Sequence, residues 1–262
     1  KYVGPAGPVD YGLSVLAIQS ADGEPLAVLA NYSMHYFGSP LVSADYFGRF
    51  CEKLATKIAA STEGENQSRA FVAIMSQGTS GDLHWMDYSK PQKRISLDEY
   101  SQQVADVAFK AWQSIEYRDE VTLAIAQAKL KLRRRTPDDK RLEWSREMVA
   151  KLGERNPRSR PEIYAREAIF LHEQPEIELI LQAVRIGDVA IAAIPNEVYG
   201  ITGLKIKRQS PLPHTFNIEL ANGAEGYIPP PEQHTLGGYT TWPARTAGLE
   251  EQAAPQIVET IL

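Results

Sequence analysis

The sequence lacks several features that would assign it to a common class. Cys51 is the single cysteine in 262 residues, so an internal disulfide framework is excluded. No apolar run approaches the roughly 20 residues that a membrane-spanning helix needs. The formal net charge of -5 argues against a general nucleic-acid binder, because such proteins carry a strongly basic surface. The chain also has no internal repeat and no low-complexity tract.

What remains has the composition of an ordinary globular protein. Hydrophobic residues make up 43% of the chain and charged residues 23%. A chain of this length buries a core that needs no covalent support. Short apolar runs alternate with segments of helical period, which predicts an α/β fold: a mixed β-sheet flanked by helices, as a single domain over residues 1–262.

The apolar pattern sets the expected elements. Strands are predicted over residues 13–18, 26–30, 70–75, 121–132, 177–186, 189–194 and 216–220. Helices are predicted over residues 45–60, 97–115, 138–152, 162–172, 201–209 and 248–262, the second capped by Ser96 with Glu99 as a capping box. Residues 133–173 form a polar helical insert with few large apolar side chains. We expect it to cover one side of the sheet as a cap.

His35 stands where the predicted strand 26–30 runs out into a loop of small residues. Asp45 follows that loop and is suited to open the next helix. A histidine at a strand end, beside a Gly/Ser/Pro loop, is well placed to hold a metal in a cleft. An isolated histidine is more often a satisfied core or hairpin residue, so the other junctions decide between these interpretations.

Three further junctions also follow apolar strands and open loops: Gly81-Asp82, Glu197 and Tyr227. In an α/β sheet such junctions cluster at one edge. One His and one Glu with a further oxygen donor suit zinc, although the usual catalytic pattern needs one more nitrogen ligand. The alternatives are a structural Gly-x-x-Gly-Asp loop, a Glu197 carboxylate favoured by a helix dipole, and ordinary packing of a loop tyrosine.

The order of these residues resembles the neutral/alkaline non-lysosomal ceramidase family, most closely its shorter bacterial members of unassigned activity. The resemblance covers residues 9–262. It is carried by Asn31-x-x-x-His35, Ser43-x-Asp45, Gly81-Asp82, Glu197 and Gly226-Tyr227-Ile228-x-x-x-Glu232. In that family two His, one Glu and one Tyr hold a zinc ion. The resemblance therefore implies Zn²⁺ as cofactor, with His35, Glu197 and Tyr227 as metal ligands.

Tyr239 stands where the family has a second tyrosine, which contacts the scissile amide. Its separation from Tyr227 fits the family spacing and is the most specific part of the match. The resemblance implies a catalytic and substrate-binding role for Tyr239. We also expect Asp82 among the catalytic residues and Gly81 among the substrate-binding ones.

Two departures from the family pattern matter. The family's other zinc histidine and its substrate-contacting arginine lie in a segment that would precede Lys1. We therefore expect the chain to be the C-terminal part of a larger ceramidase-like catalytic domain. In addition, the family's Gly-Asp-Val-Ser-Pro-Asn carries an essential serine, and His84 stands at that position in Gly81-Asp82-Leu83-His84.

The predicted activity is zinc-dependent hydrolysis of an amide bond in a small-molecule or lipid N-acyl substrate. A zinc-bound water would attack the carbonyl, Tyr239 would stabilise the oxyanion, and His84 would move the proton. The alternatives are a hydrolase of a different amide or ester, and a non-catalytic lipid- or carbohydrate-binding protein. By the resemblance, the protein would be periplasmic or secreted, with peripheral contact to a membrane surface allowed and no nucleic-acid partner.

Overall fold

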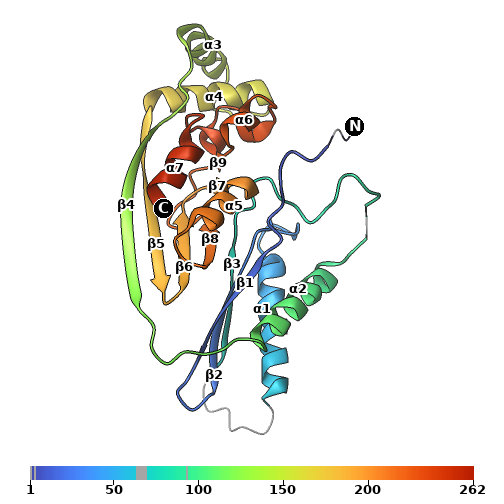
Figure 1. The fold of residues 1–262 in the computed structure, drawn as a ribbon. Helices are drawn as coiled ribbons and strands as arrows, with labels where there is room; N and C mark the ends of the chain where they lie inside the picture. The colour runs from blue at the N-terminus through green and yellow to red at the C-terminus, as the bar shows by residue number, and fades with distance from the viewer. Residues whose placement is uncertain (1, 3, 63–69, 93) are drawn as a thin grey trace.

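The computed structural model describes residues 2, 4–62, 70–92 and 94–262, and its architecture is α/β (Figure 1). The predicted fold class is confirmed, because mixed sheets are flanked by helices. Within the described residues the strands divide among three sheets instead of forming one. The first sheet contains β1 (Leu13–Gln19), β2 (Pro25–Tyr32) and β3 (Val72–Gln77) in that order.

The second sheet has the order β4-β5-β6-β8 and lies beside the first. Its strands are β4 (Leu123–Arg133), β5 (Glu176–Ile186), β6 (Val189–Ile194) and β8 (His214–Glu219). A third, two-stranded sheet pairs β7 (Glu197–Val198) with β9 (Tyr227–Ile228). Strand pairs β2–β3, β6–β8 and β7–β9 are parallel, so each pair ends at one shared edge.

The helices follow the predicted order. They are α1 (Asp45–Ser61), α2 (Leu97–Trp112), α3 (Asp139–Ala150), α4 (Arg160–Glu173), α5 (Gly200–Gln209), the short α6 (Pro231–His234) and α7 (Ala253–Ile261). Two 3₁₀ turns, Tyr239–Thr241 and Arg245–Ala247, precede α7. The last helix therefore begins later than the predicted residue 248, because Leu249 bridges to Arg134 as extended chain.

Two separate hydrophobic clusters form the core. In the first, α1 and α2 cover one face of the β1–β3 sheet (Figure 1), with Phe50 and Leu54 packed against Val28. Ser96 and Glu99 form the predicted capping box at the start of α2. In the second cluster, Ile257 of α7 and Ile206 of α5 pack against the β4–β8 sheet. Burying such side chains contributes about 1.5–3 kcal/mol each.

The strand ends of the two large sheets meet. The Asn31 side chain of β2 donates to the Asn217 carbonyl of β8 at 2.8 Å and to Ser76 of β3 at 3.1 Å. The Gln77 amide, at the end of β3, donates to the Glu219 carboxylate, at the end of β8, at 2.8 Å. The loops that leave these strands are therefore brought to one region of the molecule.

The polar insert contains α3 and α4, which lie beyond the end of β4 and β5 (Figure 1). Glu167 of α4 accepts three hydrogen bonds from Arg245, two from its guanidinium and one from its backbone N–H. The insert is thereby fastened to the segment that follows Tyr239. In the part of the chain that the structure describes, no helix is both long and apolar enough to cross a bilayer.

Candidate functional site

Glu197 and Tyr227 lie opposite each other in the two-stranded parallel sheet. Their side chains interact directly, and Tyr227 is 9% exposed. Burial raises the pKa of Tyr227, and hydrogen bonds to Tyr239 and Glu197 raise it further. Strands β7 and β9 thus place a carboxylate and a phenol oxygen at one point, although α5 and β8 lie between these strands in the chain.

His35 faces this pair. Its Nε2 lies 3.8 Å from the Glu197 carboxylate oxygen Oε2, and both side chains are half-buried. The loop that follows His35 is shaped by Asp45, whose carboxylate accepts hydrogen bonds from the backbone N–H groups of Phe37, Gly38 and Ser39. Asp45 is the first residue of α1, with φ of 47°, and turns back toward the loop.

Tyr239 completes the cluster from the solvent side. Its hydroxyl donates to the Tyr227 hydroxyl at 3.3 Å, and the two rings meet edge to face at 5.5 Å. Tyr239 is 59% exposed, in contrast to the buried Tyr227. Tyr239 is therefore accessible to an incoming molecule while its hydroxyl contacts the buried Tyr227.

His84 lies close to the same cluster. Its ring centroid is 6.5 Å from that of His35 and 5.8 Å from that of Trp85. Partial desolvation lowers the pKa of His84, and the neighbouring His35 lowers it further. His84 therefore stays neutral near pH 7, and its Nδ1 accepts the Met86 backbone N–H at 3.4 Å, which leaves Nε2 as the other ring nitrogen.

Gly81 and Asp82 contact the backbone beneath the cluster. The Gly81 N–H donates to the Val198 carbonyl at 2.8 Å, and a Cβ on Gly81 would lie 2.9 Å from the Glu197 carbonyl oxygen. The Asp82 carboxylate accepts the Gly200 N–H at the start of α5, at 2.8 Å. Both contacts fix the strand that carries Glu197, and glycine is needed because the two backbones approach so closely.

Two buried carboxylates near the site escaped the sequence analysis. Glu219 accepts the Val198 N–H at 2.7 Å and both the N–H and the hydroxyl of Ser80. Asp10 pairs with Lys207 at 2.6 Å and accepts the Ser33 hydroxyl at 3.1 Å. Glu219 thus ties the Gly81 loop to β7, and Asp10 anchors the strand end that leads to His35.

Glu219 is expected to make stability depend on pH. Burial raises the pKa of Glu219 from 4.5 to about 7, against the hydrogen bonds from Ser80 and Val198 that lower it. Between these values the folded chain holds a proton that the unfolded chain has released. Stability therefore falls as pH rises through this window, by on the order of 3 kcal/mol.

The measurement is urea unfolding of the wild type and of Glu219→Gln at several pH values from 4.5 to 7.5. The amide in this variant carries no titrating proton, so the variant should lose this part of the pH slope. If stability depended equally on pH in the two proteins, the pH dependence could not be attributed to Glu219. Glu147→Gln, at an exposed position of α3, is the matched control and should keep the wild-type slope.

The donor atoms of the cluster include types that zinc binds. His35 supplies one nitrogen, and Glu197 and Tyr227 supply two oxygens, which is a mixed set of the kind that zinc accepts. Within residues 2, 4–62, 70–92 and 94–262, no group of three or more His, Cys, Asp or Glu side chains is arranged to hold a metal. By donor type, His35, Glu197 and Tyr227 match part of a zinc ligand set, and the usual catalytic pattern would need one more nitrogen ligand.

Comparison with known proteins gives a likeness in structure. No family model matches the chain, and no curated protein matches it in sequence. The crystal structure of neutral ceramidase from Pseudomonas aeruginosa is similar with a TM-score of 0.61 and 16% identity, over 97% of this chain and 46% of that one. A structure described as ceramidase complexed with C2 has a TM-score of 0.60 and 14% identity, over 96% and 47%.

These comparisons establish the fold. These two similar structures are described as ceramidases, the first as a neutral ceramidase, and the chain spans about half the length of each. His35, Glu197, Tyr227 and Tyr239, which the sequence pattern singled out, lie together in this fold. His84 lies beside them, whereas Gly81 and Asp82 contact the supporting backbone.

Proposed function

We propose that the protein is a zinc-dependent hydrolase of amide bonds in N-acyl substrates. The observation that carries this proposal is the convergence of His35, Glu197, Tyr227 and Tyr239, which come from three well-separated stretches of the chain. Each of these side chains has an ordinary structural explanation by itself. Because the four side chains lie together in a fold that is similar to that of ceramidases, we infer that they act together in one functional site.

His35, Glu197 and Tyr227 would hold the metal, together with a histidine that the family resemblance places upstream of Lys1. When bound, zinc would supply a Lewis acid for the carbonyl oxygen and lower the pKa of a bound water. Glu197 also accepts from the Tyr227 hydroxyl, and its carboxylate lies 3.8 Å from His35 Nε2. The carboxylate is therefore next to both of the other proposed donors.

Tyr239 would stabilise the negative charge that develops on the substrate oxygen. Its hydroxyl donates to Tyr227 in this structure and lies on the exposed residue of the cluster. On substrate binding the O–H would turn from Tyr227 to the substrate oxygen, where a positioned donor stabilises the developing charge. His84 would exchange a proton with the leaving amine, because it lies near His35 and is accessible to substrate.

Gly81 and Asp82 would act as positioning residues for this reaction. The Gly81 N–H is used by the Val198 carbonyl, and the Asp82 carboxylate by the Gly200 N–H. The proposed substrate is a lipid or small-molecule N-acyl amide, and the proposed location is periplasmic or extracellular. Contact with a membrane surface would be peripheral. These proposals rest on the family resemblance.

Replacing Tyr239 with phenylalanine tests the oxyanion role. We expect Tyr239→Phe to lower kcat for an N-acyl amide about 100-fold, because one donor to the oxyanion is lost. The zinc content should stay that of the wild type, since Tyr227 is retained. The measurement is release of a chromogenic amine from an N-acyl amide by the full-length protein. Tyr11→Phe, at an exposed tyrosine, is the control.

An unchanged kcat in Tyr239→Phe would contradict the oxyanion role. A non-catalytic ceramidase-like binding protein is the second candidate, favoured by His84 at the family's serine position and by the three donors found among the described residues. It predicts that no amide or ester is turned over even when the full-length protein carries zinc.

A further inference from the structure

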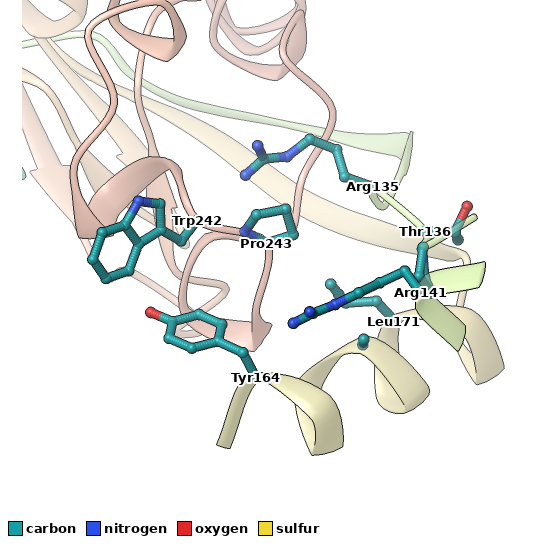
Figure 2. Close-up of a pocket in the computed structure, with 9 residues that line it drawn as sticks. Arg135, Thr136, Arg141, Tyr164, Leu171, Trp242 and Pro243 are labelled. Carbon is teal, nitrogen blue, oxygen red and sulfur yellow. The ribbon is translucent and has the colours of Figure 1, made fainter. Parts of the chain in front are cut away.

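A second candidate site lies in the helical insert. A cavity of about 360 Å³ opens between the end of β4, helices α3 and α4, and the segment at Trp242 and Pro243 (Figure 2). Its volume is in the range of pockets that hold small organic ligands. The residues that line it include none of the cluster formed by His35, Glu197 and the two tyrosines. The cavity is therefore distinct from that cluster.

One part of the cavity is apolar. The rings of Tyr164 and Trp242 meet edge to face at 5.7 Å, and Leu171, with 1% of its surface exposed, also lines the cavity. Figure 2 shows the two rings side by side with Pro243 next to them. Such surfaces accept an aromatic ring or a short alkyl chain, because ring edges and faces attract one another and apolar area leaves water.

The other part of the cavity is cationic. Arg141 is exposed on α3 and stacks on Trp144, with the guanidinium 4.0 Å from the ring centroid. In Figure 2 its side chain extends toward Tyr164 and Pro243. Among the residues that the structure describes, no carboxylate lies within ion-pair distance of Arg141. Its planar fork of N–H donors therefore faces the cavity without an anionic partner.

Arg135 adds a second positive charge at the cavity wall. Its guanidinium donates to the carbonyl oxygens of Thr241, Ala247 and Leu249, at 2.8, 2.5 and 3.0 Å. These carbonyl partners are neutral. Glu251 interacts with the Arg135 guanidinium electrostatically but forms no ion pair with it, so the positive charge of this half-buried side chain is only partly compensated. Two guanidinium groups and no lining carboxylate give the cavity a positive potential.

We propose that this cavity binds a small monocarboxylate with an aromatic or short alkyl body. The carboxylate would take a bidentate hydrogen bond from Arg141, and the apolar body would lie against Trp242, Tyr164 and Leu171. A ligand that carries several charges fits less well, because the Arg135 guanidinium already donates to three carbonyl oxygens and the remaining wall is mainly apolar. The proposal does not depend on the hydrolase activity proposed above.

Calorimetric titration with phenylbutyrate and with its neutral amide, phenylbutyramide, tests the proposal. We expect phenylbutyrate to bind at least about tenfold more tightly than phenylbutyramide. Arg141→Gln should weaken phenylbutyrate binding about tenfold and leave the amide unaffected. Arg146→Gln, an exposed arginine on the same helix, is the matched control and should bind as the wild type does.

Four results would overturn the proposal. Equal affinity for the acid and the amide would show that charge is not recognised. Unchanged binding in Arg141→Gln, or no binding of phenylbutyrate by the wild type, would remove the assigned site. Loss of binding in His35→Ala with retention in Arg141→Gln would place the ligand in the other cluster instead.

Discussion

Replacing His35 with alanine is expected to lower kcat/KM for an N-acyl amide at least about 1,000-fold in the full-length protein. His35 supplies the one nitrogen among the three donors that converge on Glu197 and Tyr227. Its loss would leave Glu197, Tyr227 and the proposed upstream histidine, a set that is one ligand short of the four that zinc normally has and therefore holds the metal more weakly. The measurement is steady-state hydrolysis of an N-acyl amide that releases a chromogenic amine.

His84→Ala separates the metal role from the proton-transfer role. A general acid or base contributes typically about 100-fold or more, so this variant should lose turnover while keeping its zinc. His214→Ala, at an exposed histidine at the start of β8, should behave as the wild type. Retained activity in His35→Ala would contradict the ligand assignment. Retained activity in His84→Ala alone would remove the proton-transfer role and leave the metal role intact.

Glu219→Ala is expected to lower the free energy of unfolding by about 3–5 kcal/mol. The carboxylate accepts hydrogen bonds from the N–H groups of Ser80 and Val198 and from the Gln77 amide. An alanine leaves these buried donors without an acceptor and opens a cavity between the two sheets. A change of this size is exceptional for one substitution and is diagnostic of a buried polar network.

Denaturant unfolding at neutral pH measures the effect. Glu219→Gln should cost less, because its amide oxygen can accept from the two backbone groups, and its NH₂ group can donate to Ser80 once the Gln77 amide turns its oxygen toward it. Glu147→Ala, on the exposed face of α3, should change stability by no more than about 0.5 kcal/mol. A Glu219→Ala protein as stable as the wild type would show that the network contributes little.

The fold was predictable where local pattern decides it. The apolar runs that became β2, β5 and β6, and the capping box at Ser96, lie at or near the predicted positions. The division into three sheets was not predictable, because strand pairing is set by long-range contacts such as that from Asn31 to Asn217. The two-residue strands β7 and β9 are too short to leave a periodic signal.

The candidate site, too, was predictable only where local sequence pattern marks its residues. His35, Glu197 and Tyr227 were visible in the sequence because each follows an apolar strand, and the family resemblance supplied their roles. Glu219 and Asp10 were missed because acidic residues are usually exposed, and nothing local marks a buried one. Their partners, a serine and a lysine, lie far away in the sequence, so these pairs appear in three dimensions alone.

Elemental zinc analysis of the full-length protein and of its Glu197→Gln variant tests the central claim most directly. This substitution keeps the size of the side chain but removes the charged oxygen donor beside His35. We predict about one zinc per chain in the wild type and much less in Glu197→Gln, with Glu178→Gln on β5 as the unchanged control. Wild-type zinc content in Glu197→Gln, or a full-length protein that binds no zinc, would contradict the metal site.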